Sequence, residues 1–289
     1  MTTVHYIRGR GNPPSFQDIY EEVRWLEFVY CPGQTLENRV EVLRNTSKKY
    51  PFSIYKTHYS PKEFSIRDDA FYIVQVRNPI DALASLVPFM RSHSPEFAKM
   101  WGGFPPFAGE EAKSDDMIEF EKLMLEGVGV LQPALDNFML NIILGFWNYR
   151  HHKNVLFVHY TDRIKDNIGQ IERIAKFIGV QLTDDELSLV ANSTAFETMK
   201  KNASRYNLQH AFDMFKESGQ IPSEVSSILS SGNLVDKGPA RDGNKDLPQD
   251  FVRRAKIYIL KRTGPEIYKW LMEGGVFPIN AKIPENTFH

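Results

Sequence analysis

The sequence contains almost no cysteine and no excess of charge of either sign. Cys31 is the single cysteine among 289 residues, so the chain has no internal disulfide framework, and this usage is typical of a reducing compartment. Lys and Arg number 35 against 36 Asp and Glu, a formal net charge of −1. This balance creates no global basic field that would attract nucleic acid or an anionic membrane. Any anion site must therefore be local.

The sequence also lacks long apolar runs and the common motifs for metals and nucleotides. No run approaches the roughly 20 apolar residues that span a bilayer, and the first residues lack the apolar core of a signal peptide. We therefore expect a soluble, cytoplasmic protein with no membrane partner. No Cys/His cluster has the usual zinc spacing, so we expect no metal site. Neither a Gly-x-x-x-x-Gly-Lys-Ser/Thr loop nor a Gly-x-Gly-x-x-Gly motif occurs, which disfavours several other nucleotide-dependent transferases.

The length and the apolar content set the scale of the fold. With 42% hydrophobic residues, 289 residues can bury one large α/β core. We expect a single domain over residues 1–289. Residues 16–27 are typical of a short helix or turn, and residues 155–159 of a strand. Thr183 and Glu186 have the spacing of a capping box at the start of a helix.

A short apolar run, residues 71–76, ends where a strand is expected to give way to a helix. The run is β-branched and aromatic, Asn78 is suited to cap a helix, and Pro79 fits the first helical position. Arg77 would then lie at a crevice where backbone N–H groups face an anion. Together with Ser85, which follows two turns later, it suits a phosphate. The alternative is a surface arginine and an ordinary polar serine on that helix.

Lys56 and His58 form the second candidate pair. Side chains alternate along a strand, so Lys56 and His58 are predicted to project to one face and Thr57 to the other. A fixed positive charge beside an imidazole suits the removal of a proton from an acceptor while negative charge grows on a leaving group. The alternative is an edge strand with two solvated side chains.

Four segments, taken in order, resemble motifs of the PAPS-dependent cytosolic-type sulfotransferases. They are the Lys-Thr-His segment at residues 56–58, the strand and helix of residues 76–85, the strand end of residues 155–162 and the Thr-Ala-Phe segment of residues 194–202. The similarity runs from about residue 4 to about residue 250. The resemblance implies an α/β fold of three layers, P-loop-like, with a central parallel sheet flanked by helices.

The resemblance also implies a reaction and a set of site residues. A sulfuryl group would pass from PAPS, 3′-phosphoadenosine 5′-phosphosulfate, to a hydroxyl or amine of a small acceptor, without a metal. His58 would act as base on the acceptor, and Lys56 would stabilise charge on the departing phosphate oxygen. Arg77 and Ser85 would hold the 3′-phosphate. The nucleotide would be surrounded by three further residues, Tyr160, Thr194 and Phe196.

A glycine-rich tract, residues 230–245, resembles the family segment that closes over the 3′-phosphate. Lys237 and Gly238 match that segment. Asp236 falls where an arginine is usual, which removes one positive partner, and Arg241 is the candidate substitute. A solvated flexible loop is the alternative for this tract.

The family's 5′-phosphosulfate loop, a Pro-Lys-Ser-Gly-Thr-Thr-Trp type of turn, does not occur before residues 3–8. We therefore expect the N-terminal strand and loop of the fold to be missing or replaced, which would remove backbone N–H groups and a lysine from the 5′-phosphate. This leaves open a second reading, a catalytically inactive sulfotransferase-like protein that binds adenosine 3′,5′-bisphosphate or a protein partner. The acceptor, the oligomeric state, with a homodimer among the options, and the true start of the working protein also stay open.

Overall fold

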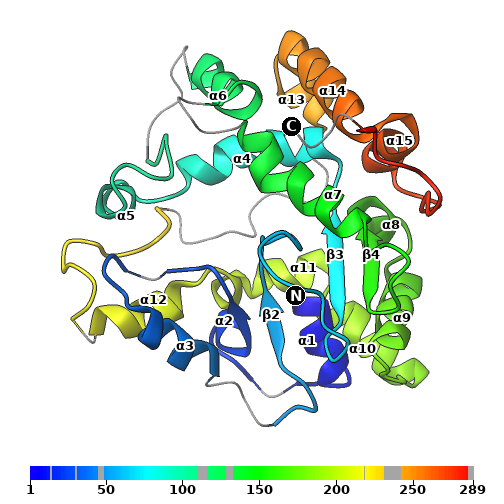
Figure 1. The fold of residues 1–289 in the computed structure, drawn as a ribbon. Coiled ribbons are helices and arrows are strands. Elements are labelled where there is room, and N and C mark those ends of the chain that lie inside the picture. Colours follow the sequence, from blue (N-terminus) through cyan, green and yellow to red (C-terminus); the bar gives the residue numbers. More distant parts are fainter. Residues whose placement is uncertain are drawn as a thin grey trace. The chain divides into compact units, whose positions relative to one another are not determined.

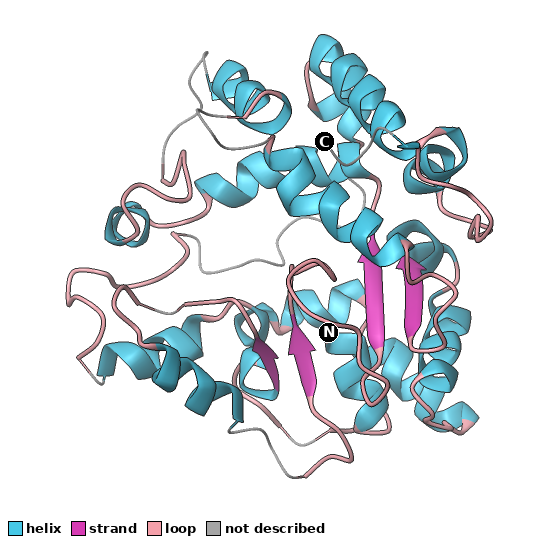
Figure 2. Ribbon diagram, in the orientation of Figure 1, coloured by secondary structure: helices cyan, strands magenta, loops and turns pink. Residues whose placement is uncertain are grey.

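The computed structural model describes residues 1–13, 15–29, 31–44, 49–109, 116–127, 133–217, 219–230 and 242–285. The chain divides into two compact units. Unit 1 comprises Met1–Thr57, Pro88–Glu111 and Ile171–Pro239, and unit 2 comprises His58–Val87, Ala112–Gln170 and Ala240–His289. Figure 1 labels their helices and strands, and Figure 2 separates them by type. The expectation of a single domain over residues 1–289 depends on how these two units join. It stays a prediction.

Unit 1 is built on a parallel pair of short strands, β1 and β2, with helices from three parts of the chain. The strands are β1 (Val23–Trp25) and β2 (Ile54–Lys56), and Val23 pairs with Ile54 while Trp25 pairs with Lys56. The helices of this unit are α1 (Thr2–Arg8), α2 (Ile19–Glu22), α3 (Leu36–Arg44), α5 (Pro95–Met100), α10 (Asp184–Ser193), α11 (Phe196–Lys201), the 3₁₀ turn η2 (Ala203–Tyr206) and α12 (Gln209–Glu217).

The core of unit 1 gathers apolar side chains around this strand pair. Ile19, Val23 and Phe212 are fully buried in it. The buried cluster also contains Phe16, Tyr20, Cys31, Ile54, Phe97, Tyr206, Leu208, Ile221, Val225, Ile228 and Leu229. Cys31 is thus a packed apolar side chain, and burial raises the pKa of its thiol. Because each strand has only three residues, this packing rather than the ladder must supply most of the stability of the pair.

A buried polar cluster joins α1, α2 and the segment before β2. The Arg8 guanidinium pairs with the Glu22 carboxylate at 3.1 Å and donates to the Phe52 carbonyl at 3.1 Å. It also lies 4.0 Å from the ring centroid of Tyr50 and donates to His5 Nδ1. Arg8 therefore ties three parts of unit 1 together, and its burial is compensated by charge and hydrogen bonds.

Unit 2 is built on the second parallel pair, β3 (Tyr72–Val76) and β4 (Val155–His159), drawn as the longer arrows in Figure 2. Five residue pairs are in register, from Tyr72 with Val155 to Val76 with His159. The helices that lie within this unit are α6 (Asp116–Leu125), the π-helix η1 (Asp136–Leu140), α7 (Asn141–Trp147), α8 (Tyr160–Lys165), α13 (Gly243–Asp246), α14 (Gln249–Thr263) and α15 (Pro265–Glu273). Helices α4 (Pro79–Arg91) and α9 (Asn167–Phe177) begin in unit 2 and end in unit 1.

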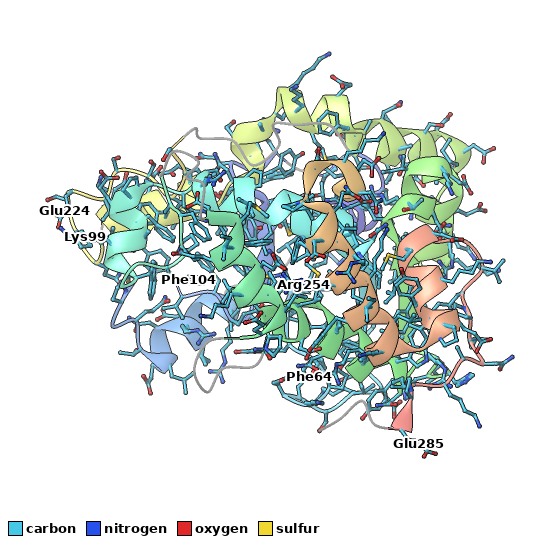
Figure 3. All side chains as sticks on the ribbon, turned by 90° about the horizontal axis from the view of Figure 1, so that it is seen from above. Phe64, Lys99, Phe104, Glu224, Arg254 and Glu285 are labelled. Atoms are coloured by element: carbon cyan, nitrogen blue, oxygen red, sulfur yellow. The ribbon has the colours of Figure 1, made fainter. Side chains whose placement is uncertain are left out.

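Aromatic rings cover β4 in unit 2. The centroid of the Phe157 ring lies 5.5 Å from Trp147 and 4.9 Å from Phe277. The Trp147 indole N–H donates to the Ala281 carbonyl at 3.0 Å, which satisfies its one polar atom. On α14, Arg254, which Figure 3 labels, forms ion pairs with carboxylates of α6 and of its own helix. These contacts pack α7 and the segment of Phe277 and Ala281 against β4, and tie α6 to α14.

Candidate functional site

Two of the predicted site residues, Arg77 and Tyr160, come together at the ends of β3 and β4. Val76 and His159 are the last residues in register, so Arg77 and Tyr160 directly follow adjacent strand ends. The Arg77 guanidinium carbon lies 5.1 Å from the centroid of the Tyr160 ring, which is within the range of a cation–π contact. Both side chains are half-buried. The carboxyl ends of parallel strands are the usual ligand-binding edge of an α/β sheet.

The helix that follows Arg77 begins as the sequence predicts. Asn78 Oδ1 accepts a hydrogen bond from the Ile80 N–H at 2.9 Å, and Asn78 Nδ2 donates to the Met272 carbonyl at 3.0 Å. Pro79 is the first residue of α4. Ser85 is half-buried on this helix, and its hydroxyl donates to the Asp81 carbonyl at 2.9 Å. The Ser85 hydroxyl oxygen keeps lone pairs that can accept a further hydrogen bond.

The described end of the glycine-rich tract, from residue 242 onward, returns to the first turn of α4. The Gly243 N–H donates to Asp81 Oδ1 at 2.9 Å. A Cβ at Gly243 would lie 2.4 Å from the Ile80 carbonyl oxygen, so only glycine permits this approach. Three predicted site residues of the tract, Lys237, Gly238 and Arg241, lie outside the described residues.

Sequence reasoning missed Arg163, a second guanidinium near Tyr160. Arg163 lies three residues after Tyr160 on α8, a spacing that places two side chains on one helix face. Its burial lowers the pKa of the guanidinium, and the Tyr160 hydroxyl opposes this shift. Its Nε donates to Asn167 Oδ1 at 3.4 Å. Over the part of the chain that the structure describes, neither Arg77 nor Arg163 forms an ion pair with a carboxylate. This spacing from Tyr160 is the signal that could have identified Arg163.

Lys56 belongs to unit 1 and lies against aromatic rings. Its Nζ is 3.4 Å from the centroid of the Trp25 ring and 5.5 Å from that of Tyr20, and it donates to the Tyr20 hydroxyl at 3.4 Å. Burial lowers the pKa of Lys56 from 10.5 to about 8, and the Glu27 carboxylate opposes this shift. The ammonium group is therefore still largely protonated at pH 7.

The strand that was expected to carry both Lys56 and His58 is shorter than predicted. Strand β2 ends at Lys56, so the alternation that would place the two side chains on one face does not extend to His58. The His58 side chain is exposed and belongs to unit 2. The physical reason lies in the partner strand. Strand β1 ends at Trp25, so Lys56 is the last residue of β2 that has a partner in register.

Thr194 and Phe196 flank the junction of α10 and α11 in unit 1. Thr194 is buried, and its hydroxyl donates to the Val190 carbonyl at 2.8 Å, which completes the last turn of α10. Phe196 is the first residue of α11, is half-buried, and has the Lys200 ammonium 5.9 Å from its ring centroid. The predicted nucleotide-binding residues are thus divided between the units, with Arg77, Ser85 and Tyr160 in unit 2.

Within the described ranges, no group of three or more His, Cys, Asp or Glu side chains is placed to hold a metal ion. None of the helices formed by the described residues is both long enough and apolar enough to cross a bilayer.

The fold and the strand-end site define an α/β protein that presents an arginine and a tyrosine beside a capped helix. Residues 4–227 match the family model of the sulfotransferase domain. The chain belongs to the sulfotransferase family.

Two curated relatives and one solved structure illustrate the likeness. Sulfotransferase 2A2 of Rattus norvegicus is 26% identical over 239 residues, which is 82% of this chain and 69% of that protein. The 3-alpha-hydroxysteroid sulfotransferase of Cavia porcellus is 27% identical over 198 residues, 68% of this chain and 59% of that protein. A retinol dehydratase in complex with androsterone and inactive cofactor PAP is 18% identical, with a TM-score of 0.60 over 91% of this chain and 78% of that one. The last likeness confirms the predicted α/β, sulfotransferase-like fold class.

Proposed function

We propose that this chain transfers a sulfuryl group from PAPS to a hydroxyl or amine of a small acceptor. The observation that carries the proposal is the pair Arg77 and Tyr160 at the paired ends of β3 and β4, next to the capped start of α4. In a member of the sulfotransferase family, this is the arrangement that an anionic nucleotide requires.

The residues of this strand end fit a doubly phosphorylated adenosine. The Arg77 guanidinium is half-buried, and no carboxylate of the described residues pairs with it, so it can donate to phosphate oxygens. The Ser85 hydroxyl is the second group that we assign to the 3′-phosphate. We assign the surroundings of the nucleotide to a wider set, Tyr160, Thr194, Phe196, Lys237, Gly238 and Arg241.

The transfer step is assigned to His58 and Lys56. Bound PAPS would supply an activated sulfuryl group on an anionic phosphate, so positioning and charge neutralisation would dominate catalysis. The exposed imidazole of His58 would take the proton from the acceptor. The ammonium group of Lys56 would neutralise charge that develops on the departing phosphate oxygen.

The name of one relative guides the choice of the first acceptor to test. The name of the Cavia porcellus relative specifies a 3-alpha-hydroxysteroid, and we take a steroid alcohol as the first acceptor to test. We place the reaction in the cytoplasm and assign it no metal.

Nucleotide binding is tested by calorimetric titration of the chain with adenosine 3′,5′-bisphosphate. Arg77→Ala removes charge-assisted hydrogen bonds of about 1.5–3 kcal/mol, so Kd should rise about 10- to 150-fold. Arg67→Ala is the matched control, because Arg67 precedes β3 at the opposite end of the strand and its guanidinium forms an exposed pair with Asp69 at 2.7 Å. This control should leave Kd unchanged. A parent chain that binds no nucleotide would contradict the proposal.

The transfer step is tested with radiolabelled PAPS and a steroid alcohol. His58→Ala should lower transfer about 100- to 10,000-fold, the usual contribution of a general base, while Kd for adenosine 3′,5′-bisphosphate stays nearly constant. Binding without any transfer by the parent chain, over a panel of hydroxyl and amine acceptors, would favour the inactive alternative.

A further inference from the structure

Trp25 and Lys56 are direct partners across the parallel pair of unit 1. They are in register at the ends of β1 and β2, and the Leu26 N–H donates to the Lys56 carbonyl at 2.9 Å just beyond them. Neighbouring strands lie about 4.8 Å apart, and partners in register present their side chains on the same face. The backbone therefore brings the indole ring to the lysine side chain.

The ammonium group of Lys56 rests on the face of this ring. A distance of 3.4 Å from Nζ to the ring centroid is well inside the limit of about 6 Å for a cation–π contact. The indole plane is itself fixed by two stacked neighbours, Tyr20 at 6.0 Å and Phe28 at 4.8 Å between centroids, both inclined by 25°. The stacked rings of Tyr20 and Phe28 thus hold the Trp25 ring on which the lysine lies.

We propose that Trp25 is the positioning residue for Lys56: its indole face holds the ammonium group at one place, charged and shielded from water, for the transfer step. The inference rests on the proposed function and adds a residue to it. A free lysine side chain has about 2 kcal/mol of rotamer entropy to lose, and the contact with Trp25 removes this freedom before substrate binds. Trp25 acts through Lys56 and is assigned no contact with reacting atoms.

Two opposing effects act on the charge of Lys56. Burial favours the neutral amine and lowers its pKa to about 8, whereas the electron-rich ring face favours the cation. Glu27, just after β1, raises the pKa, and the Tyr20 hydroxyl on α2 accepts a hydrogen bond from Nζ. The two carboxylates of α2 are paired elsewhere, Glu21 with His210 and Glu22 with Arg8.

The two effects can be separated by choosing what replaces the ring. Trp25→Leu keeps an apolar neighbour but removes the ring face, so the pKa of Lys56 should fall by about half a unit to one unit. Trp25→Met serves as a second variant with the same expected sign. Trp25→Phe retains a ring and should keep most of the parent value. Trp25→Ala admits water and should raise the pKa.

The pKa of Lys56 is measured without turnover, from the rate of trace acetylation of its amine between pH 6 and pH 11, followed by mass spectrometry. Tyr55→Leu is the matched control, since Tyr55 is the preceding residue of β2, is 45% exposed and points to the opposite face. It should leave the profile unchanged. A Trp25→Leu or Trp25→Met variant whose Lys56 profile equals that of the parent would overturn the inference.

Activity provides the second readout. Lys56 is charged below its pKa, so kcat of the parent should decline above about pH 8, and in Trp25→Leu this decline should begin about half a unit to one unit lower. KM for PAPS should change little, because the charge on the departing oxygen develops only during transfer. An unshifted decline with a raised KM would overturn the positioning role. Absence of transfer in the parent would overturn the proposed function, and the acetylation profile would still decide whether Trp25 governs Lys56.

Discussion

Acid is expected to act on unit 1 through two fully buried groups, His5 and Asp18, in opposite directions. Burial lowers the pKa of His5 from 6.5 to about 3, and the neighbouring Arg8 charge adds to this shift. Burial raises the pKa of Asp18 from 3.8 to about 6, although its Oδ1 accepts from the Tyr20 N–H at 3.0 Å. Within the described structure, Asp18 Oδ2 and His5 Nε2 have no hydrogen-bond partner, which is why each group resists its charged form.

The direction in which each group changes the unfolding free energy follows from the number of protons that the folded and unfolded chains bind. The unfolded chain protonates His5 near pH 6.5 and the folded chain only near pH 3, so stability from His5 is lost as pH falls through this window. Between pH 7 and pH 5 this loss is about 2 kcal/mol. The folded chain protonates Asp18 near pH 6 and the unfolded chain near 3.8, so acid adds stability, about 1.3 kcal/mol over the same step. The two contributions largely cancel in the parent.

Two substitutions should uncover the two contributions. His5→Gln removes one titration and retains an acceptor for Arg8, so its change in unfolding free energy from pH 7 to pH 5 should be about 2 kcal/mol more favourable than that of the parent. Asp18→Asn retains the cap acceptor for the Tyr20 N–H, and its change should be about 1.3 kcal/mol less favourable. Urea unfolding at the two pH values, followed by circular dichroism, measures both. Variants with the same pH slope as the parent would refute the reasoning.

Three further substitutions test packing, a buried ion pair and a cap. Gly243→Ala places a methyl group against the Ile80 backbone, so it should lower the unfolding free energy by about 1–3 kcal/mol in urea. Asp136→Ala leaves the Arg262 guanidinium, now 2.9 Å from that carboxylate, without its partner and should cost about 3–5 kcal/mol by the same assay. Thr183→Ala removes the hydrogen bond that the threonine hydroxyl accepts from the Glu186 N–H in the observed capping box, and should cost about 1 kcal/mol, seen as a lower thermal midpoint.

Each of the three variants Gly243→Ala, Asp136→Ala and Thr183→Ala has a control substitution in the same region. Lys245→Ala alters an exposed neighbour of Gly243 on α13 and should stay within about 0.5 kcal/mol of the parent. Asp250→Ala breaks only exposed ion pairs on α14 and should cost far less than Asp136→Ala. Thr183→Ser keeps the capping hydroxyl and should behave as the parent does. Equal effects of a variant and its control would contradict the structural reason given for that variant.

The five-residue strands β3 and β4 of unit 2 were predictable from sequence, whereas strand β1 of unit 1 was not. The runs at residues 71–76 and 155–159 correspond to β3 and β4 almost residue for residue, because buried parallel strands are continuous β-branched runs. Residues 16–27 were predicted as a short helix or turn, and α2 confirms that in part. The same segment also contains β1, whose three residues form a strand only because β2 pairs with them. Local propensity carries no signal for such a strand.

The candidate site shows the same division between local and distant determinants. The sequence predicted the helix start at Asn78 and the capping box at Thr183, since both depend on residues a few positions apart, and the structure confirms them. The prediction of one strand that carries both Lys56 and His58 is wrong, because β2 ends at Lys56. The surroundings of Lys56 could not be predicted, because Trp25 is 31 positions away and reaches it through a strand that the sequence did not reveal.

The two candidate cations have the same structural origin in the two units. Lys56 lies on the ring of its partner in register, Trp25, and Arg77 lies on the ring of Tyr160, one position beyond the last registered pair. In each case a cation at the end of one parallel strand is held by an aromatic ring at the end of the next. Because a slip of one residue would turn every side chain to the other face, the place of each charge also depends on the buried residues that set the register of its strand. Val74 and Ile54, buried in β3 and β2, are therefore part of what positions the charges, and substitutions that loosen them should weaken the function before they unfold the chain.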